Sequence, residues 1–226
     1  MQLCSYVVVH DKGFAPNPYH GFCTLTACTP NRAGKRFESG DWLIGHSTKA
    51  RGQQLIYAMR ISEVLDFDNY YRDPRFTAKK PRSGPSWADV CGDNIYHRGE
   101  SGDWVMDPNL FHDPARYLKK DTKHPRVFIS DYFFYFGDKA PNIPAEFGSL
   151  IWPRQGVNCK HDPEVAAEFV EWLQSTYDPG IHGEPMDRED VPADMRPIVQ
   201  LTMKGRSANS GVSPRVPMHS RPRRGC

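Results

Sequence analysis

The feature that most constrains this chain is a series of short apolar strands that run directly into polar loops. The strand Val7–Val9 leads into HDKGFAPNPY (10–19), and GDWLIGHS (40–47) follows soon afterwards. A further predicted strand, 54–64, precedes DPRF (73–76). Apolar strands that end in loops dense in His, Asp, Asn, Lys and Gly are a common way for a fold to present a ligand site. The first third of the sequence therefore predicts a binding site without defining a reaction.

Length and composition place the chain among globular proteins. Its 226 residues correspond to one large domain, at roughly 100–200 residues per domain, and hydrophobic and charged residues make up 38% and 25% of the chain. We predict a single α+β domain over residues 1–190. The segment 191–226 is rich in Pro, Ser and Arg, and we expect it to form a disordered tail.

Apolar runs are too short for a membrane segment, which needs about 18 or more consecutive apolar residues. The run Val7–Val9 is also too short for a signal peptide, and charged residues follow it at once. We therefore expect a cytoplasmic protein with no membrane contact. In that compartment the cysteines should be reduced thiols; they are Cys4, Cys23, Cys28, Cys91, Cys159 and Cys226.

The formal net charge of +2 is unevenly distributed. From Lys204 to the end the chain has basic residues and no acidic ones, so the positive excess belongs to the tail. The rest of the sequence lacks the overall basic character of a nucleic-acid-binding domain. The tail is either a nonspecific contact to phosphates or a solubilising segment.

The strand pattern predicts a mainly β fold with one packed helix near the C-terminal end. The β-branched and aromatic segments 7–9, 22–27, 41–45, 54–64 and 127–136 are the predicted strands. The last of these carries apolar side chains on both faces, which is typical of a fully covered strand. Asp162 suits a helix N-cap and Pro163 the first helical position. Val165, Phe169, Trp172 and Leu173 then form one apolar stripe.

One group of residues has the chemistry of acid–base catalysis. His10 and Asp11 follow a strand, where a histidine can act as a base that a carboxylate orients. Asp131 interrupts the most apolar strand, so it must be paired or face a pocket. Lys49 and Arg51, beside Ser47 in a predicted hairpin, are suited to contact a phosphate. Each residue also has a structural interpretation, as a loop hydrogen bond, an ion pair or a solvated turn.

A second group of residues is suited to recognise a base. Asn17 lies between two prolines, and a fixed amide offers a donor and an acceptor side by side. Trp42 provides a flat face for stacking or, alternatively, a core side chain. The glycine-bounded loop of Asp93, Asn94 and Tyr96 predicts a polar pocket wall. We add Phe14 and Tyr135 as aromatic contacts.

Several other kinds of site are disfavoured. His20, Cys23 and Cys28, and Cys159 with His161, are zinc-capable side chains, but their spacing matches no standard zinc module. The sequence has no phosphate-binding Walker loop, no Gly-x-Gly-x-x-Gly fingerprint and no Gly-x-Ser-x-Gly elbow. We therefore assign no metal ligand, and the cofactor stays unknown.

Six segments within residues 5–150, taken in their order along the chain, resemble a known family, the bacterial and phage nucleotide modification associated domain, type two. They are VVVHDKGFAPNP (7–18), GDWLIGHSTK (40–49), IYAMRISE (56–63), DPRF (73–76), GDNIY (92–96) and ISDYFFYFG (129–137). The resemblance implies an association with DNA base-modification systems but no particular reaction. The order of the segments is also similar to the PUA, ASCH and EVE group of barrels, which bind RNA or modified bases. That similarity implies a partly closed, PUA-like β-barrel.

Three functions are consistent with these observations. The first is a binding module for a nucleotide or modified base, in which an aromatic side chain stacks the base. The second is an enzyme that modifies or processes a nucleotide with His10 as the base. The third is a non-catalytic subunit of a modification or defence complex. The expected partners are accordingly a nucleotide, a modified base or nucleic acid, and other proteins of a modification system.

Overall fold

The computed structural model describes residues 1–84 and 86–188; the predicted tail, 191–226, lies outside them. The helices are α1 (Thr29–Arg32), α2 (Phe67–Arg72), α3 (Trp87–Val90), α4 (Pro114–Asp121) and α5 (Pro163–Thr176). The strands are β1 (Leu3–Val7), β2 (Cys23–Leu25), β3 (Trp42–His46), β4 (Leu55–Arg60), β5 (Glu63–Asp66), β6 (Tyr96–Arg98), β7 (Trp104–Met106), β8 (Arg126–Ser130), β9 (Tyr132–Tyr135), β10 (Val157–Asn158) and β11 (Gly180–Ile181). Short 3₁₀ turns are η1 (Lys49–Arg51), η2 (Pro74–Lys79), η3 (Gly137–Lys139) and η4 (Ala145–Leu150).

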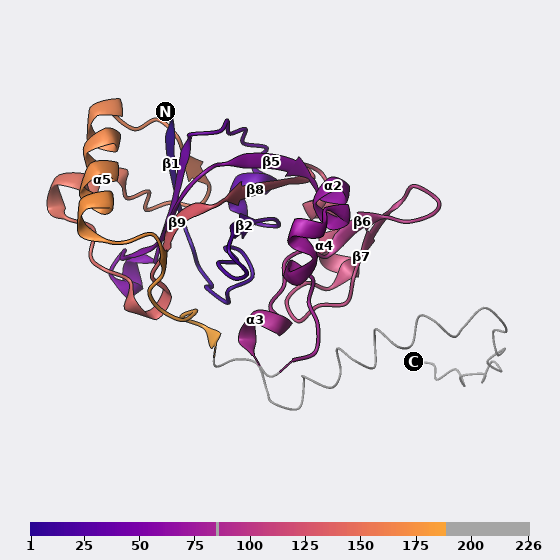
Figure 1. The fold of residues 1–226 in the computed structure, drawn as a ribbon. Coiled ribbons are helices and arrows are strands. Elements are labelled where there is room, and N and C mark those ends of the chain that lie inside the picture. The colour runs from indigo at the N-terminus through magenta and orange to yellow at the C-terminus, as the bar shows by residue number, and fades with distance from the viewer. Residues whose placement is uncertain (85, 189–226) are drawn as a thin grey trace, which may run out of the picture.

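A six-stranded mixed sheet in the order β10-β1-β3-β4-β9-β11 forms the centre of the fold. Successive side chains of a strand point to opposite faces, so each central strand contributes to two clusters. Trp42, Ile44 and Phe134 pack with Phe169 and Leu173 of α5 on one face. Figure 1 shows α5 at the left of the molecule, alongside this sheet. The predicted helix is confirmed, with Asp162 as its N-cap and Pro163 at its start.

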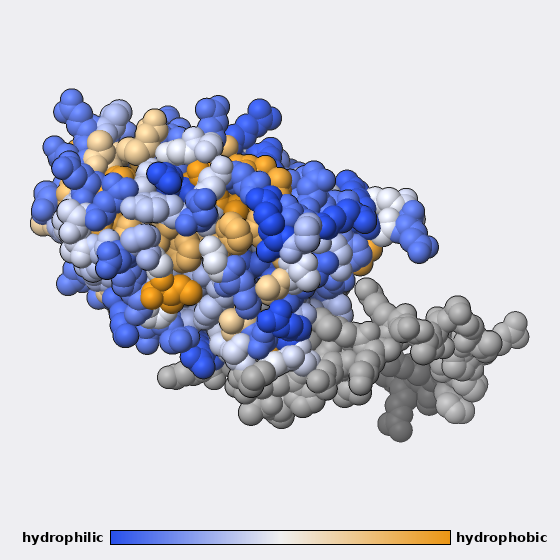
Figure 2. All heavy atoms as spheres, viewed as in Figure 1, coloured by the Kyte–Doolittle hydropathy of each residue, from blue (hydrophilic) through white to orange (hydrophobic). Residues whose placement is uncertain are grey.

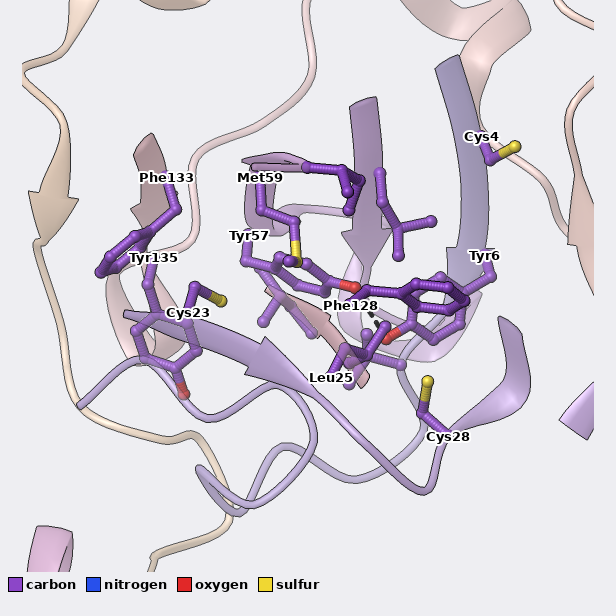
Figure 3. Packing of buried hydrophobic residues seen from close by; sticks show 14 of the residues in the cluster. Cys4, Tyr6, Cys23, Leu25, Cys28, Tyr57, Met59, Phe128, Phe133 and Tyr135 are labelled. Carbon is purple, nitrogen blue, oxygen red and sulfur yellow. Dashed lines mark hydrogen bonds between the residues drawn. The ribbon is translucent and has the colours of Figure 1, made fainter. Parts of the chain in front are cut away.

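The opposite face of the sheet carries a second cluster in which two tyrosines meet. The Tyr57 hydroxyl donates to the Tyr6 hydroxyl at 2.9 Å, and both side chains are buried among apolar residues. Figure 3 shows this pair between Met59 and Leu25, with the thiol of Cys28 directed toward it. The covered strand that the sequence predicts is confirmed in β9, where Phe133 and Phe134 belong to different clusters.

The two long predicted strands each divide into two. The segment 54–64 forms β4 and β5, and the segment 127–136 forms β8 and β9. β4 pairs with β9 in the large sheet, whereas β5 pairs with β8 in a separate three-stranded sheet, β2-β8-β5. The antiparallel ribbon therefore leaves one sheet and enters the next. Ser62 and Asp131 lie at this bend, where the Asp131 amide donates to Ser62 Oγ at 3.0 Å and the Ser62 hydroxyl donates to Asp131.

The fold is mixed α+β with more strand than helix, as predicted, but its sheets do not close into a barrel. In the described residues the strands form three separate sheets, the smallest being β6-β7. Phe67, Tyr70 and Phe76 pack with Tyr96 and Val127 into a third cluster beneath these smaller sheets. Figure 1 shows α2, α4, β6 and β7 together at the end of the molecule away from α5. The first strand also begins earlier than predicted, because Val8 and Val9 follow β1 instead of forming it.

The prediction that every cysteine is reduced is wrong. Cys4 and Cys159 form a disulfide, with their Cα atoms 4.2 Å apart. Antiparallel pairing of β1 with β10 places Ser5 opposite Asn158, and this brings the two cysteines together. Spacing in the sequence gave no indication of this pairing, since 155 positions separate the two residues. The thiols of Cys23, Cys28 and Cys91 are free and buried.

The exterior of the described domain is largely polar on the face shown in Figure 2. No helix among the described residues has the length and apolar character to cross a bilayer. On the face shown in Figure 2, hydrophobic residues occur in small patches within a largely hydrophilic surface. That face therefore presents no extended apolar area.

Candidate functional site

A cleft of about 420 Å³ opens beside the C-terminal end of β1. Three segments line it: the residues that follow β1, the turn from Ala27 into α1, and the segment 110–117, which contains the start of α4. These segments are far apart in the sequence and converge only in the fold. The volume lies within the range of about 300–1,000 Å³ that is typical of small-molecule sites.

Aromatic rings form one wall of this cleft. The ring centre of Phe14 lies 5.1 Å from that of Phe111 and 4.9 Å from that of His112. The imidazole of His112 in turn stacks on Tyr117, with 4.4 Å between the ring centres and 14° between the planes. Rings that are already packed against one another keep their orientation without a ligand. The wall is thus a preformed surface on which a planar group can stack.

Behind this wall lies a polar group that we call the cleft network: Arg32, Tyr96, His112 and Asp121. The Tyr96 hydroxyl donates to Asp121 Oδ2 at 2.7 Å and lies 2.9 Å from His112 Nδ1. His112 Nδ1 is 3.0 Å from the same carboxylate oxygen. We therefore assign the proton of neutral His112 to Nδ1, which leaves Nε2 as an acceptor. Nε2 makes no hydrogen bond within residues 1–84 and 86–188, and the ring lines the cleft.

Arg32 holds the other oxygen of the carboxylate. Its Nε donates to Asp121 Oδ1 at 2.6 Å, while its Nη2 is buried and lacks a hydrogen-bond partner among the described residues. Burial by itself would raise the pKa of Asp121. Hydrogen bonds from His112, Arg32 and Tyr96 outweigh that effect and hold the pKa below its usual range. The carboxylate stays ionised and keeps both cleft side chains in place.

The charge along the cleft is of one sign. Lys12 and Arg32 are the charged side chains that line it, and none of the described residues that line it is an aspartate or glutamate. Asp121 lies behind the wall with its side chain fully buried. A concave surface lined by cations attracts anions and raises their local concentration. The cleft is accordingly suited to an anionic ligand with a planar group.

The loop that follows β1 is held firmly at the edge of the cleft. Gly13 has a φ of +70°, and a Cβ there would lie 2.8 Å from Cγ of Pro185, so this position requires glycine. The Trp87 indole donates to the Lys12 carbonyl at 2.8 Å. Asp11 and Asp187 exchange hydrogen bonds, each through its backbone N–H, at 2.8 Å. The loop is therefore packed against residues from a distant part of the chain.

Two of the three predicted catalytic residues lie in this loop but do not act as a pair. The side chain of His10 is 73% exposed, and its Nδ1 lies 4.0 Å from Asp187 Oδ2. The carboxylate of Asp11 is buried and accepts from the Tyr135 hydroxyl at 2.7 Å and from the Met186 amide at 3.2 Å. Burial raises the pKa of Asp11 to about 6 despite these bonds. Asp11 and Tyr135 thus support the loop from below, whereas His10 and Phe14 line the cleft.

Other predicted residues belong to a second polar group, which we call the buried cluster: Asn17, Thr24, Tyr70, Lys79 and Asp93. Lys79 Nζ donates to the side-chain and backbone oxygens of Asn17, both at 2.9 Å. Asp93 accepts from the hydroxyls of Thr24 and Tyr70, both at 2.8 Å. Asn17 also donates to the Cys91 carbonyl at 3.0 Å. These side chains satisfy one another in the interior, and the structure does not bring them to the cleft.

Further predicted residues lie in the interior. Trp42 is buried against Phe134 beneath α5, and its indole belongs to the core. The Asn94 amide donates to two backbone carbonyls at 3.2 and 3.1 Å, while its Oδ1 is buried without a partner in the described chain. The Ser47 hydroxyl donates to the Arg51 carbonyl at 3.0 Å and accepts from the Gln54 amide at 2.9 Å, which closes the turn.

The charged residues of the predicted phosphate contact separate in space. Lys49 is exposed and lines a second hollow next to the cleft. Arg51 donates from Nη2 to Asp187 Oδ1 at 2.7 Å. Asp131 is exposed at the bend between β8 and β9 and is not among the residues that line either hollow. Of the sequence-predicted site residues, the structure places His10 and Phe14 in the cleft itself and Tyr96 directly behind it.

Sequence reasoning missed Arg32, Phe111, His112 and Asp121. Two signals were present. Phe111 and His112 stand immediately before the Asp113 N-cap of α4, where two rings would be exposed unless other residues packed against them. Asp121 is the last residue of α4, where the helix dipole disfavours a carboxylate, so a cationic partner was to be expected.

The described residues offer neither a metal site nor an activated thiol at the cleft. No group of three or more His, Cys, Asp or Glu side chains among them is arranged to hold a metal ion. Cys28 lines the cleft, but its thiol donates to Asn31 Oδ1 at 2.8 Å, and burial raises its pKa well above the usual range. A thiol with a raised pKa is a poor nucleophile because little thiolate is present.

The sequence model of the family nucleotide modification associated domain 2 matches residues 1–191. This match covers most of the chain, and the protein belongs to that family, as the resemblance of its segments predicts. Membership associates the chain with nucleotide modification. No curated protein and no solved structure matches the chain.

Proposed function

We propose that the cleft binds a nucleotide, or one nucleotide unit of a nucleic acid. The observation that carries this proposal is the combination of a stacked aromatic wall with the cationic side chains of Lys12 and Arg32 in one cleft. The family association with nucleotide modification supports the same ligand class. This is the first of the functions that the sequence suggests, although different residues perform it.

The chemistry of the wall fits the two halves of a nucleotide. A base stacks on Phe111, behind which Phe14 is buried, since every base presents a π-face and each stacked base is worth about 1–3 kcal/mol. The phosphate lies near Lys12 and Arg32. The Arg32 Nη2 donor, which has no partner in the described chain, forms a charge-assisted hydrogen bond to a phosphate oxygen.

A retention assay tests this function. The protein is incubated with a pool of unmodified and modified nucleotides, and the retained species are identified by mass spectrometry. We expect retention by the wild-type protein and a loss of at least tenfold for Phe111→Ala. Trp104→Ala is the matched control, because Trp104 is a partly buried aromatic residue that does not line the cleft. Equal retention by Phe111→Ala and wild type would contradict the proposal.

One observation favours a second candidate function, an enzyme. His112 Nδ1 faces a buried, ionised carboxylate, and this arrangement orients an imidazole for proton transfer. Nε2 then takes a proton from a hydroxyl group or water at the bound nucleotide. The acid–base pair of this candidate is His112 with Asp121, in place of His10 with Asp11.

The same assay separates binding from catalysis. A nucleotide whose mass changes with the wild-type protein, but not with His112→Gln, makes the protein an enzyme and identifies the reaction. His10→Gln is the control, because His10 is exposed and not oriented by a buried carboxylate. A ligand that both His112→Gln and wild type retain at unchanged mass supports binding alone.

A further inference from the structure

A second hollow of about 370 Å³ adjoins the cleft. It lies between the turn after β3 and the segment 153–156. The two hollows share Val7, Val9 and Thr29, so these residues form a ridge between them. A ligand that fills the cleft and passes over this ridge enters the second hollow directly.

The second hollow has the same sign of charge as the cleft. Lys49 and Arg154 line it, and no aspartate or glutamate does so among the described residues. Neither cation forms an ion pair within the described part of the chain; the guanidinium of Arg154 lies 5.8 Å from the centre of the Trp152 ring. Cations that are not matched by carboxylates are available to an external anion.

The histidine of the second hollow, His46, adds no charge. Its Nδ1 donates to the Ser47 carbonyl at 2.9 Å, and its Nε2 accepts from the Trp152 amide at 3.0 Å. Burial lowers the pKa of His46, so the ring stays neutral. It fixes the segment around residue 152 against β3. These hydrogen bonds fix one wall of the second hollow, and Lys49 and Arg154 are its charged groups.

The ridge carries an apolar side chain that is unusually accessible. Val9 is 56% exposed and is one of three large apolar residues that are exposed in the described chain. It lies between two hollows lined by cations. A nucleic-acid strand presents this alternation, because a less polar sugar and base face separates successive phosphates.

We propose that the cleft and the second hollow together bind consecutive nucleotides of a single-stranded nucleic acid. One nucleotide occupies the cleft, and the strand passes over Val9 so that the next phosphate meets Lys49 and Arg154. This inference rests on the proposed function, because it extends the ligand that the cleft binds. The ligand class is then a single-stranded nucleic acid instead of a free nucleotide. In this arrangement Lys49 makes the phosphate contact that the sequence predicts for it.

Binding of a ligand series tests the inference. Dissociation constants are measured by calorimetry for the four deoxynucleoside 5′-monophosphates, the matching triphosphates and the matching tetranucleotides. We expect the best tetranucleotide to bind wild-type protein at least tenfold more tightly than its monophosphate. The double variant Lys49→Ala/Arg154→Ala should lose that gain and bind the monophosphate within twofold of wild type. Its salt dependence should fall by about 0.7 in log–log slope, because Lys49 and Arg154 contact one phosphate and each phosphate contact contributes roughly 0.7.

A matched control and three outcomes make the test decisive. Arg60→Ala/Lys139→Ala removes the same charge outside both hollows and should leave every constant unchanged. Equal affinity for monophosphate and tetranucleotide would overturn the inference while leaving the cleft as a nucleotide site. The inference would also be overturned if the triphosphate bound as much more tightly than the monophosphate as the tetranucleotide does. The second hollow would then bind the phosphates of a single nucleotide. Failure of wild-type protein to bind any of these ligands, or any nucleotide of the retention pool, would instead refute the proposed function on which the inference rests.

Discussion

The buried cluster and the cleft network both contain a carboxylate inside the protein, yet the two carboxylates respond in opposite ways. Asp93 has a raised pKa, because desolvation by burial outweighs the Lys79 charge and the hydroxyl donors. Asp121 has a lowered pKa, because His112, Arg32 and Tyr96 outweigh the same desolvation. The comparison shows that burial of a polar residue does not by itself mark a site.

The second difference between the two groups is whether they contain hydrogen-bonding atoms without a partner in the described chain. In the buried cluster, Lys79 donates to three oxygens, and Asp93 accepts from two hydroxyls. In the cleft network, Arg32 Nη2 and His112 Nε2 have no hydrogen-bond partner in the described chain, and both residues line a hollow. Polar groups that satisfy one another stabilise the fold, whereas polar groups with unused capacity at a cleft bind ligands.

The largest effect should come from breaking the buried cluster. Lys79→Met leaves the oxygens of Asn17 and Phe22 without their donor, and we expect a loss of about 3–5 kcal/mol in the free energy of unfolding. Urea denaturation measures it. Lys79→Met/Asp93→Asn should recover part of the loss, because it also removes the second charge. A loss below about 1 kcal/mol for the single variant would show that the cluster does not hold the fold.

The next effect concerns Asp11, which lies beneath the cleft. As in Asp93, burial raises the pKa of its carboxyl group. In the folded state this pKa is about 6, raised from an ordinary value of 3.8. Between these values the folded state holds the proton that the unfolded state has lost, so stability falls as pH rises. Asp11→Asn removes this dependence, and its unfolding free energy relative to wild type should rise by about 2.4 kcal/mol between pH 4 and pH 7. Parallel pH profiles for the two proteins would contradict the raised pKa.

The third prediction perturbs the cleft network. Arg32→Gln removes the charged donor to a bound phosphate, and we expect nucleotide affinity to fall by about 1.5–3 kcal/mol, roughly 10- to 100-fold. Calorimetric titration measures the change. The control is Arg72→Gln, because the exposed Arg72 pairs with Asp68 on α2 and is not among the residues that line the cleft. Unchanged nucleotide affinity in Arg32→Gln would show that Arg32 does not contact the ligand.

The smallest effect should follow Asp131→Ala. This carboxylate is exposed at the bend between two sheets and contacts Ser62. We expect a change of less than about 1 kcal/mol in unfolding free energy and none in nucleotide affinity. A marked loss of binding in this variant would move the site away from the cleft and toward the interpretation that the sequence first suggests.

Much of the fold could be predicted from local signals. The covered strand β9 and the capped helix α5 follow from the alternation of apolar residues and from Asp162-Pro163. The division of segment 127–136 could not be predicted, because the bend at Asp131 depends on a partner, Ser62, from another strand. The disulfide of Cys4 with Cys159 could not be predicted either, because it depends on the pairing of β1 with the distant strand β10.

The site was harder to predict than the fold. Loop composition directs attention to the residues after β1, of which His10 and Phe14 line the cleft. The same criterion also selected Asn17 and Asp93, since a sequence does not reveal whether a polar side chain is satisfied by its neighbours. His112 and Arg32 come from unrelated segments, and only Asp121 brings them together.

The measurement that most directly tests the central claim is hydrogen–deuterium exchange with and without the nucleotide that the protein retains best. The account predicts that the ligand slows exchange in residues 7–15, 27–32 and 110–117, which line the cleft. It predicts no change in residues 70–79 and 91–94, which surround the buried cluster. Protection of the latter segments, with none at the cleft, would contradict the assignment of the ligand site.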